Sequence, residues 1–418
     1  METKTSLAQK SYDIVVVGGG LAGALSGLAL ARLGFRLAII DPQPIEAMLD
    51  QSYDGRTTAL AYACVRLLER LDLWADMKSE AEPIRDILVT DGHRDRSGEF
   101  AGVAGLDMHF DSRQLDGEEA LGWIIENRIM RREIYRALER EHRVELISGR
   151  KQTGFDPGKG RARLTLDNGD TIETLLVVAA DGRYSPLRSA AGIKVHKWGY
   201  PQSGIVTVVT HDRPHKGVAQ ELFLPSGPFA ILPMTENRAS LVWTEKSDAA
   251  RVYMALDDEK FRDAIASRFG EYLGHVDLQG PRWSYPLAFH LSHEFISKRL
   301  VLIGDAARAI HPIAGQGFNL GLKDIAALYD VLAEAQSVGL DIGQLATLEK
   351  YQQWRRYDST TLALGTDVLN RLFSNNIAPI RHARRLGLGA VNAIAPLRKM
   401  FMRQAGADLG ALPSLLQR

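Results

Sequence analysis

The sequence predicts an α/β protein with a mainly parallel sheet flanked by helices, an inserted domain built on an antiparallel sheet, and a helical carboxyl-terminal region. Three observations lead to this prediction. Residues 14–40 follow the order strand, glycine-rich turn, helix, strand. Residues 204–244 contain strand-like segments separated by proline and glycine, which is typical of antiparallel sheets. Beyond Gly321 the pattern is mostly helical, without a fixed-period repeat.

The amino-terminal unit follows from its local residue types. Ile14 to Val17 is a β-branched run that predicts a strand, and Leu37 to Ile40 predicts a second strand. Between them, Gly18 to Gly23 is rich in glycine, and Ala24 to Leu33 has the composition of a helix. The four segments together predict a βαβ unit with two parallel strands.

The following residues predict further helices and strands on either side of the inserted domain. We expect helices at residues 58–74 and 131–142, and strands at residues 84–90, 144–147, 162–166 and 171–178. The turn-forming cluster Asp167 to Asp170 predicts a hairpin between the last two strands. Leu300 to Ile303 is a further apolar strand, so we expect the chain to return there to the first sheet.

These elements divide the chain into a discontinuous Rossmann-like domain, an inserted domain and a helical tail. We place the first domain at residues 1–80, 115–190 and 285–345, and the inserted antiparallel-sheet domain at residues 81–114 and 191–284. Residues 346–418 form the predicted helical carboxyl-terminal region. A chain of 418 residues is long enough for two lobes that enclose a large ligand.

Composition excludes several classes of protein. Lysine plus arginine and aspartate plus glutamate number 51 each, so no overall charge favours a nucleic-acid partner. Cys64 is the sole cysteine, which excludes an intramolecular disulfide and fits a reducing compartment. The first thirteen residues are polar, and no apolar run is long enough to cross a bilayer. We therefore expect a cytoplasmic protein without a signal peptide.

A glycine motif at the first strand end predicts a dinucleotide site. Gly18, Gly20 and Gly23 form GxGxxG between a strand and a helix, where the backbone can approach a pyrophosphate at the positive helix end. Asp41 ends the next strand, 23 residues after Gly18, where a carboxylate can bind an adenosine ribose. We expect a side chain at Gly18 or Gly20 to be more damaging than one at Gly19. The alternative is a glycine turn beside a surface acid.

Two later motifs also follow apolar strands. Asp181-Gly182 follows the apolar strand predicted at residues 171–178, and Gly304-Asp305 follows the one predicted at Leu300 to Ile303. Asp305 can bond the hydroxyls of a ribityl chain, while Gly315 and Gly317 allow backbone amides to open a helix beneath a flavin ring. Each motif alone could be an ordinary turn at a strand end, but three in this order indicate FAD.

In these motifs and their order, the chain resembles the flavoprotein aromatic hydroxylases of the p-hydroxybenzoate hydroxylase fold. Within that group, three segments resemble the ubiquinone-biosynthesis hydroxylases: AGQGFNLG at residues 314–321, DGRTTAL at residues 54–60, and the tail at residues 366–375. The likeness extends over nearly the whole chain. Arg308 is a departure, because many relatives carry histidine there, and it changes the expected contacts to the pyrophosphate or the flavin ring.

The resemblance implies a set of cofactor-binding residues, of which Gly18, Gly20 and Gly23 hold the pyrophosphate, Asp41 the ribose and Asp305 the ribityl chain. The remaining cofactor-binding residues that we infer are Leu21, Ala22, Arg56, Arg128, Asp181, Gly315, Gly317, Phe318 and Asn319.

Three of these assignments have alternatives of equal or lesser weight. Arg56 is otherwise a solvated surface charge, and Arg128 a charge at the start of a helix. Asp181 resembles a residue that serves both FAD and the nicotinamide donor, but a helix-capping aspartate explains it equally well.

The resemblance also implies the reaction. NADPH or NADH reduces FAD, and one oxygen atom of O2 is then transferred to an electron-rich phenol ring. The protein binds the phenol beside the flavin and excludes water, so we assign no general base. His311 and Pro312 are candidates for lining the ring pocket, although a structural role in the loop is the stronger alternative for His311. No spacing of ligands predicts a metal site.

The implied substrate is a polyprenyl phenol intermediate of ubiquinone biosynthesis. The alternatives are a hydroxylase of a soluble aromatic compound, a non-catalytic flavoprotein scaffold in a quinone-biosynthesis complex, and a plain NAD-linked dehydrogenase. Because the implied substrate is lipid-soluble, residues 368–407, which contain no acidic residue, are a candidate for peripheral attachment to the inner face of the cell membrane. A helical cap or a subunit interface is an equal alternative for this segment.

Overall fold

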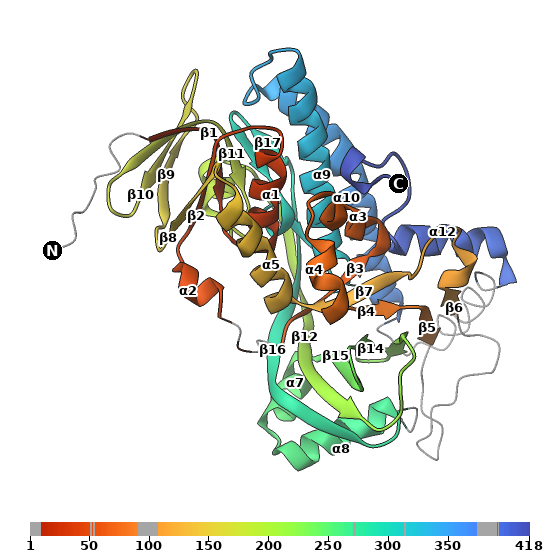
Figure 1. Cartoon of the computed structure of the whole chain (residues 1–418). Coiled ribbons are helices and arrows are strands. Elements are labelled where there is room, and N and C mark those ends of the chain that lie inside the picture. The colour runs from red at the N-terminus through yellow and green to blue at the C-terminus, as the bar shows by residue number, and fades with distance from the viewer. Residues whose placement is uncertain are drawn as a thin grey trace.

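The computed structural model describes residues 10–50, 52, 55–90, 108–270, 273–312, 315–373, 391 and 393–418. The chain forms two lobes, with the amino-terminal sheet in one and the helices α7 and α8 beneath the second sheet in the other (Figure 1). Asp54, Ile313 and Ala314 lie outside the described residues, as do residues 374–390 of the candidate membrane segment, with Arg381, Arg384 and Arg385.

The first lobe is built on a sheet with the strand order β17-β18-β11-β1-β2-β8. β1, β2, β8, β11 and β18 run parallel to one another, as their consecutive pairings show. The strands of this sheet are β1 (Lys10–Val17), β2 (Leu37–Asp41), β8 (Val144–Ser148), β9 (Gln152–Asp156), β10 (Ala162–Leu166), β11 (Thr171–Ala179), β17 (Ile296–Ser297) and β18 (Leu300–Leu302). β10 and β11 are antiparallel and form the predicted hairpin.

The second lobe is built on a mostly antiparallel sheet with the order β19-β16-β12-β15-β14-β13-β5-β6. Its strands are β5 (Asp86–Thr90), β6 (Met108–Asp111), β12 (Val195–His211), β13 (Val218–Leu224), β14 (Gly227–Met234), β15 (Arg238–Lys246), β16 (Val276–Ser292) and β19 (Arg308–Ala309). One face of this sheet packs on α7 (Ser247–Ala255) and α8 (Asp258–Phe269), with Phe229, Trp243 and Phe261 between them. The antiparallel inserted domain is confirmed.

A small third sheet, β3-β7-β4, lies between the lobes. It consists of β3 (Thr57–Ala61), β4 (Glu82–Ile84) and β7 (Gly122–Glu126), and α3 (Tyr62–Arg70) and α4 (Trp74–Met77) follow β3. The helix predicted for residues 58–74 is therefore wrong in its first part, because Thr58 to Ala61 pair with β7 as a strand. Alternating small and apolar residues there satisfy both patterns, and pairing with a distant strand decides the outcome.

Helices complete the first lobe. α1 (Leu21–Ala31) and α5 (Asn127–Arg140) lie on the parallel sheet, and α9 (Gln316–Ser337) and α10 (Leu345–Phe373) run beside each other along the molecule (Figure 1). The shorter helices are α2 (Ile45–Met48), α6 (Pro186–Ala190) and α12 (Ala395–Ala405). Together, α10 and α12 confirm a helical carboxyl-terminal region.

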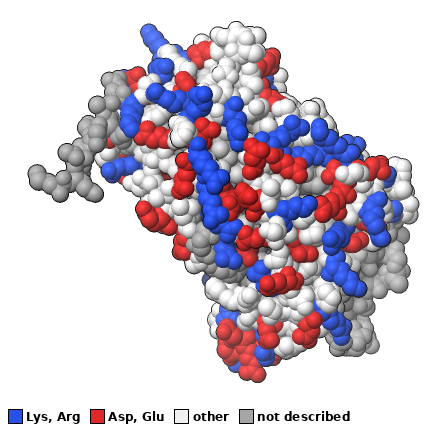
Figure 2. Space-filling model, viewed as in Figure 1, with Lys and Arg blue, Asp and Glu red and all other residues white. Residues whose placement is uncertain are grey.

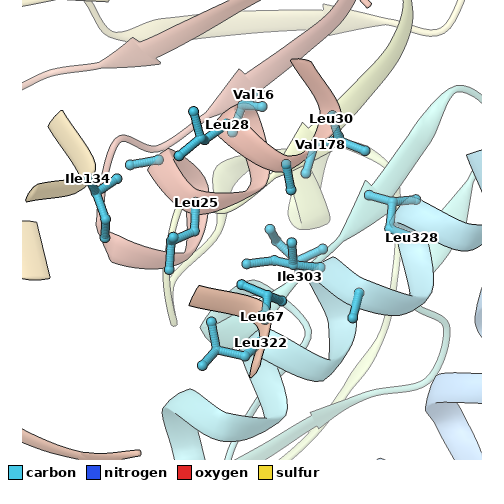
Figure 3. Close-up of a cluster of buried hydrophobic side chains, with 14 of the residues drawn as sticks. Val16, Leu25, Leu28, Leu30, Leu67, Ile134, Val178, Ile303, Leu322 and Leu328 are labelled. Carbon is cyan, nitrogen blue, oxygen red and sulfur yellow. The ribbon is translucent and has the colours of Figure 1, made fainter. Parts of the chain in front are cut away.

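The main core gathers apolar side chains from elements that are far apart in sequence (Figure 3). Val16 of β1, Leu25 of α1 and Val178 of β11 are fully buried. The same cluster contains Ile303, directly after β18, and Leu322 of α9. The cluster continues into the second lobe through Val208, Ala219 and Met234. The two lobes therefore share one continuous core.

Two long strands connect the lobes and move one predicted boundary. β16 runs without interruption from Val276 to Ser292 and pairs with β12 over most of its length. The boundary that we placed between residues 284 and 285 falls inside this strand. The proline at position 286 does not end it, and β12 has a register shift opposite this part of β16, between Gly199 and Ser203.

Candidate active site

Four predicted site residues lie at one edge of the parallel sheet. β18, β11, β1 and β2 are neighbours, and their carboxyl ends lead into Asp305, Asp181, Gly18 and Asp41. Ligands of open α/β sheets bind outside the carboxyl ends of the strands. The fold therefore brings together residues that are up to 287 positions apart in the sequence, as counted from Gly18 to Asp305.

The glycine turn has the shape that a pyrophosphate site needs. Gly18 has a φ of +106°, and a Cβ at this position would lie 2.2 Å from the carbonyl oxygen of Ala180. A Cβ at Gly23 would lie 1.8 Å from the carbonyl oxygen of Gly18. Around Gly20, by contrast, no protein atom lies within 4 Å of the position of a Cβ. This open space lies directly before α1, where helix amides without partners attract an anion.

The expected order of tolerance depends on the approach of a pyrophosphate and stays a prediction. In the protein alone, a Cβ at Gly19 would lie 2.7 Å from the hydroxyl oxygen of Tyr135 and 3.1 Å from the Cβ of Asp41. Gly19 is thus more crowded than Gly20. The cause is Tyr135 of α5, whose hydroxyl donates to the carbonyl oxygen of Gly19 at 2.7 Å, a contact that no local pattern indicates.

Asp41 is held beside the same turn. One carboxylate oxygen accepts a hydrogen bond from the backbone amide of Gly19 at 2.6 Å, and the other accepts from that of Gln43 at 2.8 Å. These two bonds fix the carboxylate at the end of β2, next to the pyrophosphate space. Its place fits the ribose-binding role inferred from the sequence.

The carboxyl group of Asp305 is surrounded by protein and is still accessible to solvent. Its side chain is exposed, yet burial by the surrounding protein raises the pKa of its carboxyl group, with Arg183 and Arg308 acting in the opposite direction. A carboxyl group with both properties lines a recess rather than an outer surface. The imidazole Nε2 of His290, on β16 of the second lobe, lies 2.9 Å from the backbone oxygen of Asp305 and donates to it.

A buried ion cluster supports the Gly304-Asp305 turn from behind. The carboxylate of Asp324, in α9, accepts from the backbone amide of Gly304 at 2.9 Å and from Arg308 Nη2 and Arg355 Nε at 2.8 Å each. All three charged side chains are at most 2% exposed. Arg308 therefore points inward and holds α9 against the turn.

The amino terminus of α9 lies beside the β3 strand. Gly315 has a φ of +61° at the residue before the helix, and Gly317 in the first turn has no protein atom within 4 Å of a Cβ position. The side-chain amide of Asn319 binds the backbone of β3: its oxygen accepts from Ala61 N at 3.0 Å, and its nitrogen donates to Ala59 O at 2.9 Å. These bonds make Asn319 a residue that positions the helix, while the space beside Gly317 in its first turn stays open.

Arg56 and Arg128 are brought together by β3 and β7. The backbone amide of Asn127 donates to the carbonyl oxygen of Arg56 at 3.0 Å, so the two arginines flank one backbone contact. Arg128 Nε donates to Glu126 at 2.6 Å, and the side chain of Arg56 is exposed. Both arginines thus lie at the border between the lobes, and Arg128 is also at the start of α5, as the alternative interpretation had it.

The two carboxylate oxygens of Asp181 differ in their contacts. Oδ2 accepts from the backbone amide of Leu187 in α6 at 3.2 Å, which is a contact to a helix start. Oδ1 is buried without a hydrogen-bond partner among the described residues, and burial raises the pKa of the carboxyl group. A buried polar atom without a protein partner is one that a ligand can satisfy.

His311 and Pro312 precede the turn into α9. His311 is 1% exposed, and neither ring nitrogen has a hydrogen-bond partner in the described part of the chain. Burial lowers the pKa of this imidazole to about 4, so it is neutral at neutral pH. Tyr200 of β12 packs against it edge to face at 5.2 Å. His311 thus contacts the sheet of the second lobe, and a lining role for His311 and Pro312 stays a prediction.

The residues fit FAD. The open space at Gly20, the fixed carboxylate of Asp41, the unpartnered oxygen of Asp181 and the enclosed carboxyl group of Asp305 line one edge of the sheet. The sequence did not identify His290, Tyr135 or Asp324. No short motif surrounds them, and each acts through a contact that only the folded chain creates.

Comparisons with known proteins agree with this site. Residues 11–357 match the model of the FAD binding domain family. The chain is 43% identical to the ubiquinone hydroxylase UbiL of Rhodospirillum rubrum, covering 99% of this chain and 94% of that protein. It is 32% identical to the 3-demethoxyubiquinol 3-hydroxylase of Escherichia coli, over 96% of this chain and 99% of that protein.

The fold is shared with aromatic monooxygenases. The crystal structure of p-nitrophenol 4-monooxygenase PnpA from Pseudomonas putida superposes with a TM-score of 0.78 at 19% identity, over 97% of this chain and all of that chain. The family match, the end-to-end sequence similarity and the fold agree on an FAD-dependent hydroxylase. This chain belongs to the FAD-dependent hydroxylases of ubiquinone biosynthesis, within the FAD binding domain family.

Proposed function

We propose that this FAD-dependent hydroxylase acts on the aromatic ring of a polyprenyl phenol, with O2 as the oxygen source and NADPH or NADH as the reductant. The observation that carries the proposal is the end-to-end similarity to UbiL, combined with the four strand ends that converge on one dinucleotide-binding edge. A similarity limited to the cofactor-binding domain would not support a shared substrate, whereas this one also covers the second lobe.

The division of labour between cofactor and protein follows from the site. Bound FAD, once reduced, supplies the oxygen chemistry that no amino-acid side chain provides. Gly18, Gly20 and Asp41 would hold its adenosine half, and Asp305 its ribityl chain. Neutral His311, buried against Tyr200, would support the segment before α9 without adding a charge beside the ring. The shared core between the lobes helps to exclude water from the reacting ring.

The test is a product analysis with purified protein that retains its yellow cofactor. The protein is given O2, NADPH or NADH, and a panel of phenols with and without prenyl chains, and the products are identified by mass spectrometry. We expect ring hydroxylation of prenyl phenols, coupled to oxidation of the reductant. Hydroxylation of soluble phenols alone would contradict the lipid substrate, and a flavoprotein that oxidises no reductant with any phenol would favour a scaffold role.

We also propose that the carboxyl-terminal region attaches the enzyme to an anionic membrane surface. Among the described residues, no helix is both long and apolar enough to cross a bilayer. Along α12 and just before it, Ile394, Met400 and Phe401 are 40% to 51% exposed, and Lys399 and Arg403 are exposed beside them. Exposed apolar side chains interleaved with cations suit an interface between water and anionic lipid.

The charge pattern of this region differs from that of the face shown in Figure 2. The face shown in Figure 2 carries intermixed positive and negative side chains, whereas residues 368–407 contain seven lysines and arginines and no acidic residue. Each basic residue near an anionic bilayer contributes about 1 kcal/mol of attraction.

Sedimentation with liposomes tests the attachment. Arg384→Glu combined with Arg385→Glu, two positions outside the described residues, should reduce binding to anionic liposomes and leave the FAD content intact. Arg251→Glu combined with Lys260→Glu is a control with the same charge change on exposed positions of α7 and α8. Equal loss in both double variants, or salt-insensitive binding by the first, would contradict an electrostatic anchor at residues 368–407.

A further inference from the structure

The carboxyl group of Glu221 lies on the face of the second-lobe sheet that is directed toward the first lobe. Residues two apart in a strand share a face, so Glu221 of β13 lies on the same side as Ala219 and Phe223. Ala219 belongs to the core shared with the first lobe, and Phe223 stacks on Phe373 of α10 with ring centroids 4.1 Å apart. Leu222, on the opposite side, packs toward α7 and α8.

A contact on a neighbouring strand identifies the same face independently. Ser240 of β15 accepts a hydrogen bond from Thr57 of β3 at 2.9 Å, so this face of β15 meets the first lobe. Ser240 and Val242 are two apart and share this face, and Val242 lies opposite Ala230 of β14. Ala230 in turn lies opposite Glu221. The carboxyl group therefore faces the space between the lobes.

The surroundings of Glu221 are otherwise apolar. Strand pairing places it in a row across the sheet that consists of Val89, Glu221, Ala230, Val242, Val206 and Trp283. At the far end of this row, the ring of Trp283 packs over Gly55, so closely that a Cβ at Gly55 would lie 1.8 Å from it. Gly55 immediately precedes Arg56, so the row leads from Glu221 to the flavin-binding segment.

The described residues offer the Glu221 carboxyl group no hydrogen bond and no ion pair. Burial alone raises its pKa to about 7, although the residue remains partly accessible to solvent. A ligand can therefore reach the carboxyl group even though protein surrounds it on the face between the lobes. An unpaired buried acid costs the folded protein free energy, and a ligand with a hydrogen-bond donor would remove that cost.

We propose that Glu221 is a substrate-binding residue that accepts a hydrogen bond from a hydroxyl group on the substrate ring, and that it excludes aromatic substrates bearing a carboxylate of their own. The inference rests on the proposed function, since it specifies how the hydroxylase selects a phenol. The apolar row on either side of Glu221 suits the ring and its hydrocarbon chain. Two carboxylates in one recess repel each other strongly, and this disfavours a benzoate ring.

Two substitutions separate the two parts of the proposal. Glu221→Gln keeps a hydrogen-bond acceptor but removes the charge, whereas Glu221→Leu removes both. The ligands are a short-chain 2-prenylphenol, its methyl ether and the matching prenylated hydroxybenzoate, and binding is measured from the change in flavin absorbance of the holoenzyme. Glu245→Gln is the matched control, because Glu245 is a buried carboxylate on the opposite face of the same sheet, 3.6 Å from Arg268.

We expect Glu221→Leu to bind the phenol on the order of tenfold to a hundredfold more weakly and to lose the preference for the phenol over its methyl ether. Glu221→Gln should keep most of that preference. Both variants should bind the hydroxybenzoate at least about tenfold better than the wild type, because the repulsion is gone. Thermal unfolding of the substrate-free variants should occur at the wild-type temperature or above it, whereas a structural carboxylate would lower it.

Wild-type binding of all three ligands by Glu221→Leu would overturn the inference, and so would lower stability with unchanged ligand preference. Equal changes in ligand preference in Glu245→Gln would overturn it as well. These outcomes are distinct from failure of the proposed function, in which the wild-type holoenzyme would hydroxylate none of the phenols.

Discussion

Gly20 and Gly23 are three residues apart in one turn, but a methyl group at each would meet different obstacles. At Gly23 it would collide with the backbone of Gly18, whereas at Gly20 it would enter open space in the protein alone. Gly20 has a φ of −61°, which alanine also adopts. The two positions thus separate the requirements of the fold from those of the cofactor.

We predict that Gly23→Ala lowers the free energy of unfolding of the apoprotein by about 1–3 kcal/mol. Gly20→Ala should leave it within about 1 kcal/mol of the wild-type value and weaken FAD binding by about tenfold or more, since the methyl group occupies the pyrophosphate space. Denaturant unfolding of the apoproteins and FAD titration measure the two effects. Tight FAD binding by Gly20→Ala would show that the pyrophosphate lies elsewhere.

His290 gives the site a dependence on pH. Burial, and then Arg188, lowers its pKa to about 4, while the unfolded chain has the ordinary value of about 6.5. Between these values the unfolded chain binds a proton that the folded one does not, so the stability that neutral His290 provides is complete above about pH 6.5 and is lost as the pH falls toward 4.

We predict that His290→Gln, which keeps a donor for the Asp305 carbonyl oxygen but does not titrate, flattens this dependence. Between pH 6.5 and pH 5 the wild type should lose about 1.5 kcal/mol more of its unfolding free energy than the variant. His275→Gln is the control, since the side chain of His275 is 63% exposed. Parallel stability curves for wild type and His290→Gln would contradict a neutral His290.

At the scale of elements, α9 depends on a single buried carboxylate. Asp324 accepts hydrogen bonds from the Gly304 amide and from two arginines, so it joins the Gly304-Asp305 turn to α9 and α10. Removing one partner from such a cluster leaves uncompensated buried charges, which is far more damaging than losing a surface pair.

We predict that Asp324→Asn reduces the unfolding free energy by about 3–5 kcal/mol and that the protein retains less FAD after purification. Glu334→Gln, in the same helix, should cost less than about 1 kcal/mol because the Glu334–Lys350 pair is exposed. Denaturant titration and the ratio of flavin to protein absorbance measure both effects. A similar small loss in the two variants would show that the cluster does not support the turn.

The elements also show how far the sequence predicts the site. The βαβ unit, Asp41 and the Gly304-Asp305 turn were predictable because glycine, β-branched runs and strand ends leave local patterns. Thr58 to Ala61 were predicted as helix and form β3, because pairing with β7 overrides local preference. The inward direction of Arg308 depends on Asp324, sixteen residues later, and no pattern around either residue indicates their contact.

At the scale of the whole molecule, the shared core predicts cooperative unfolding. Val208, Ala219 and Met234 of the second lobe belong to the cluster that fills the first. We predict a single calorimetric transition for the apoprotein and an increase in stability of about 2.7 kcal/mol when free FAD is present at a hundred times its dissociation constant. Two separate transitions, with FAD shifting only one, would show that the lobes unfold independently.

The unbroken run of β16 has a consequence for anyone who grafts the specificity of one relative onto another. A chimera joined at residue 285 would combine the two halves of one strand from different parents, and the pairing with β12 would carry the mismatch into the sheet. Junctions at residues 192–194 and 293–295, which flank β12 and β16, keep both strands whole. Such a transplant carries His290 with it, so the donor lobe must bring an imidazole that suits the recipient's Asp305 turn.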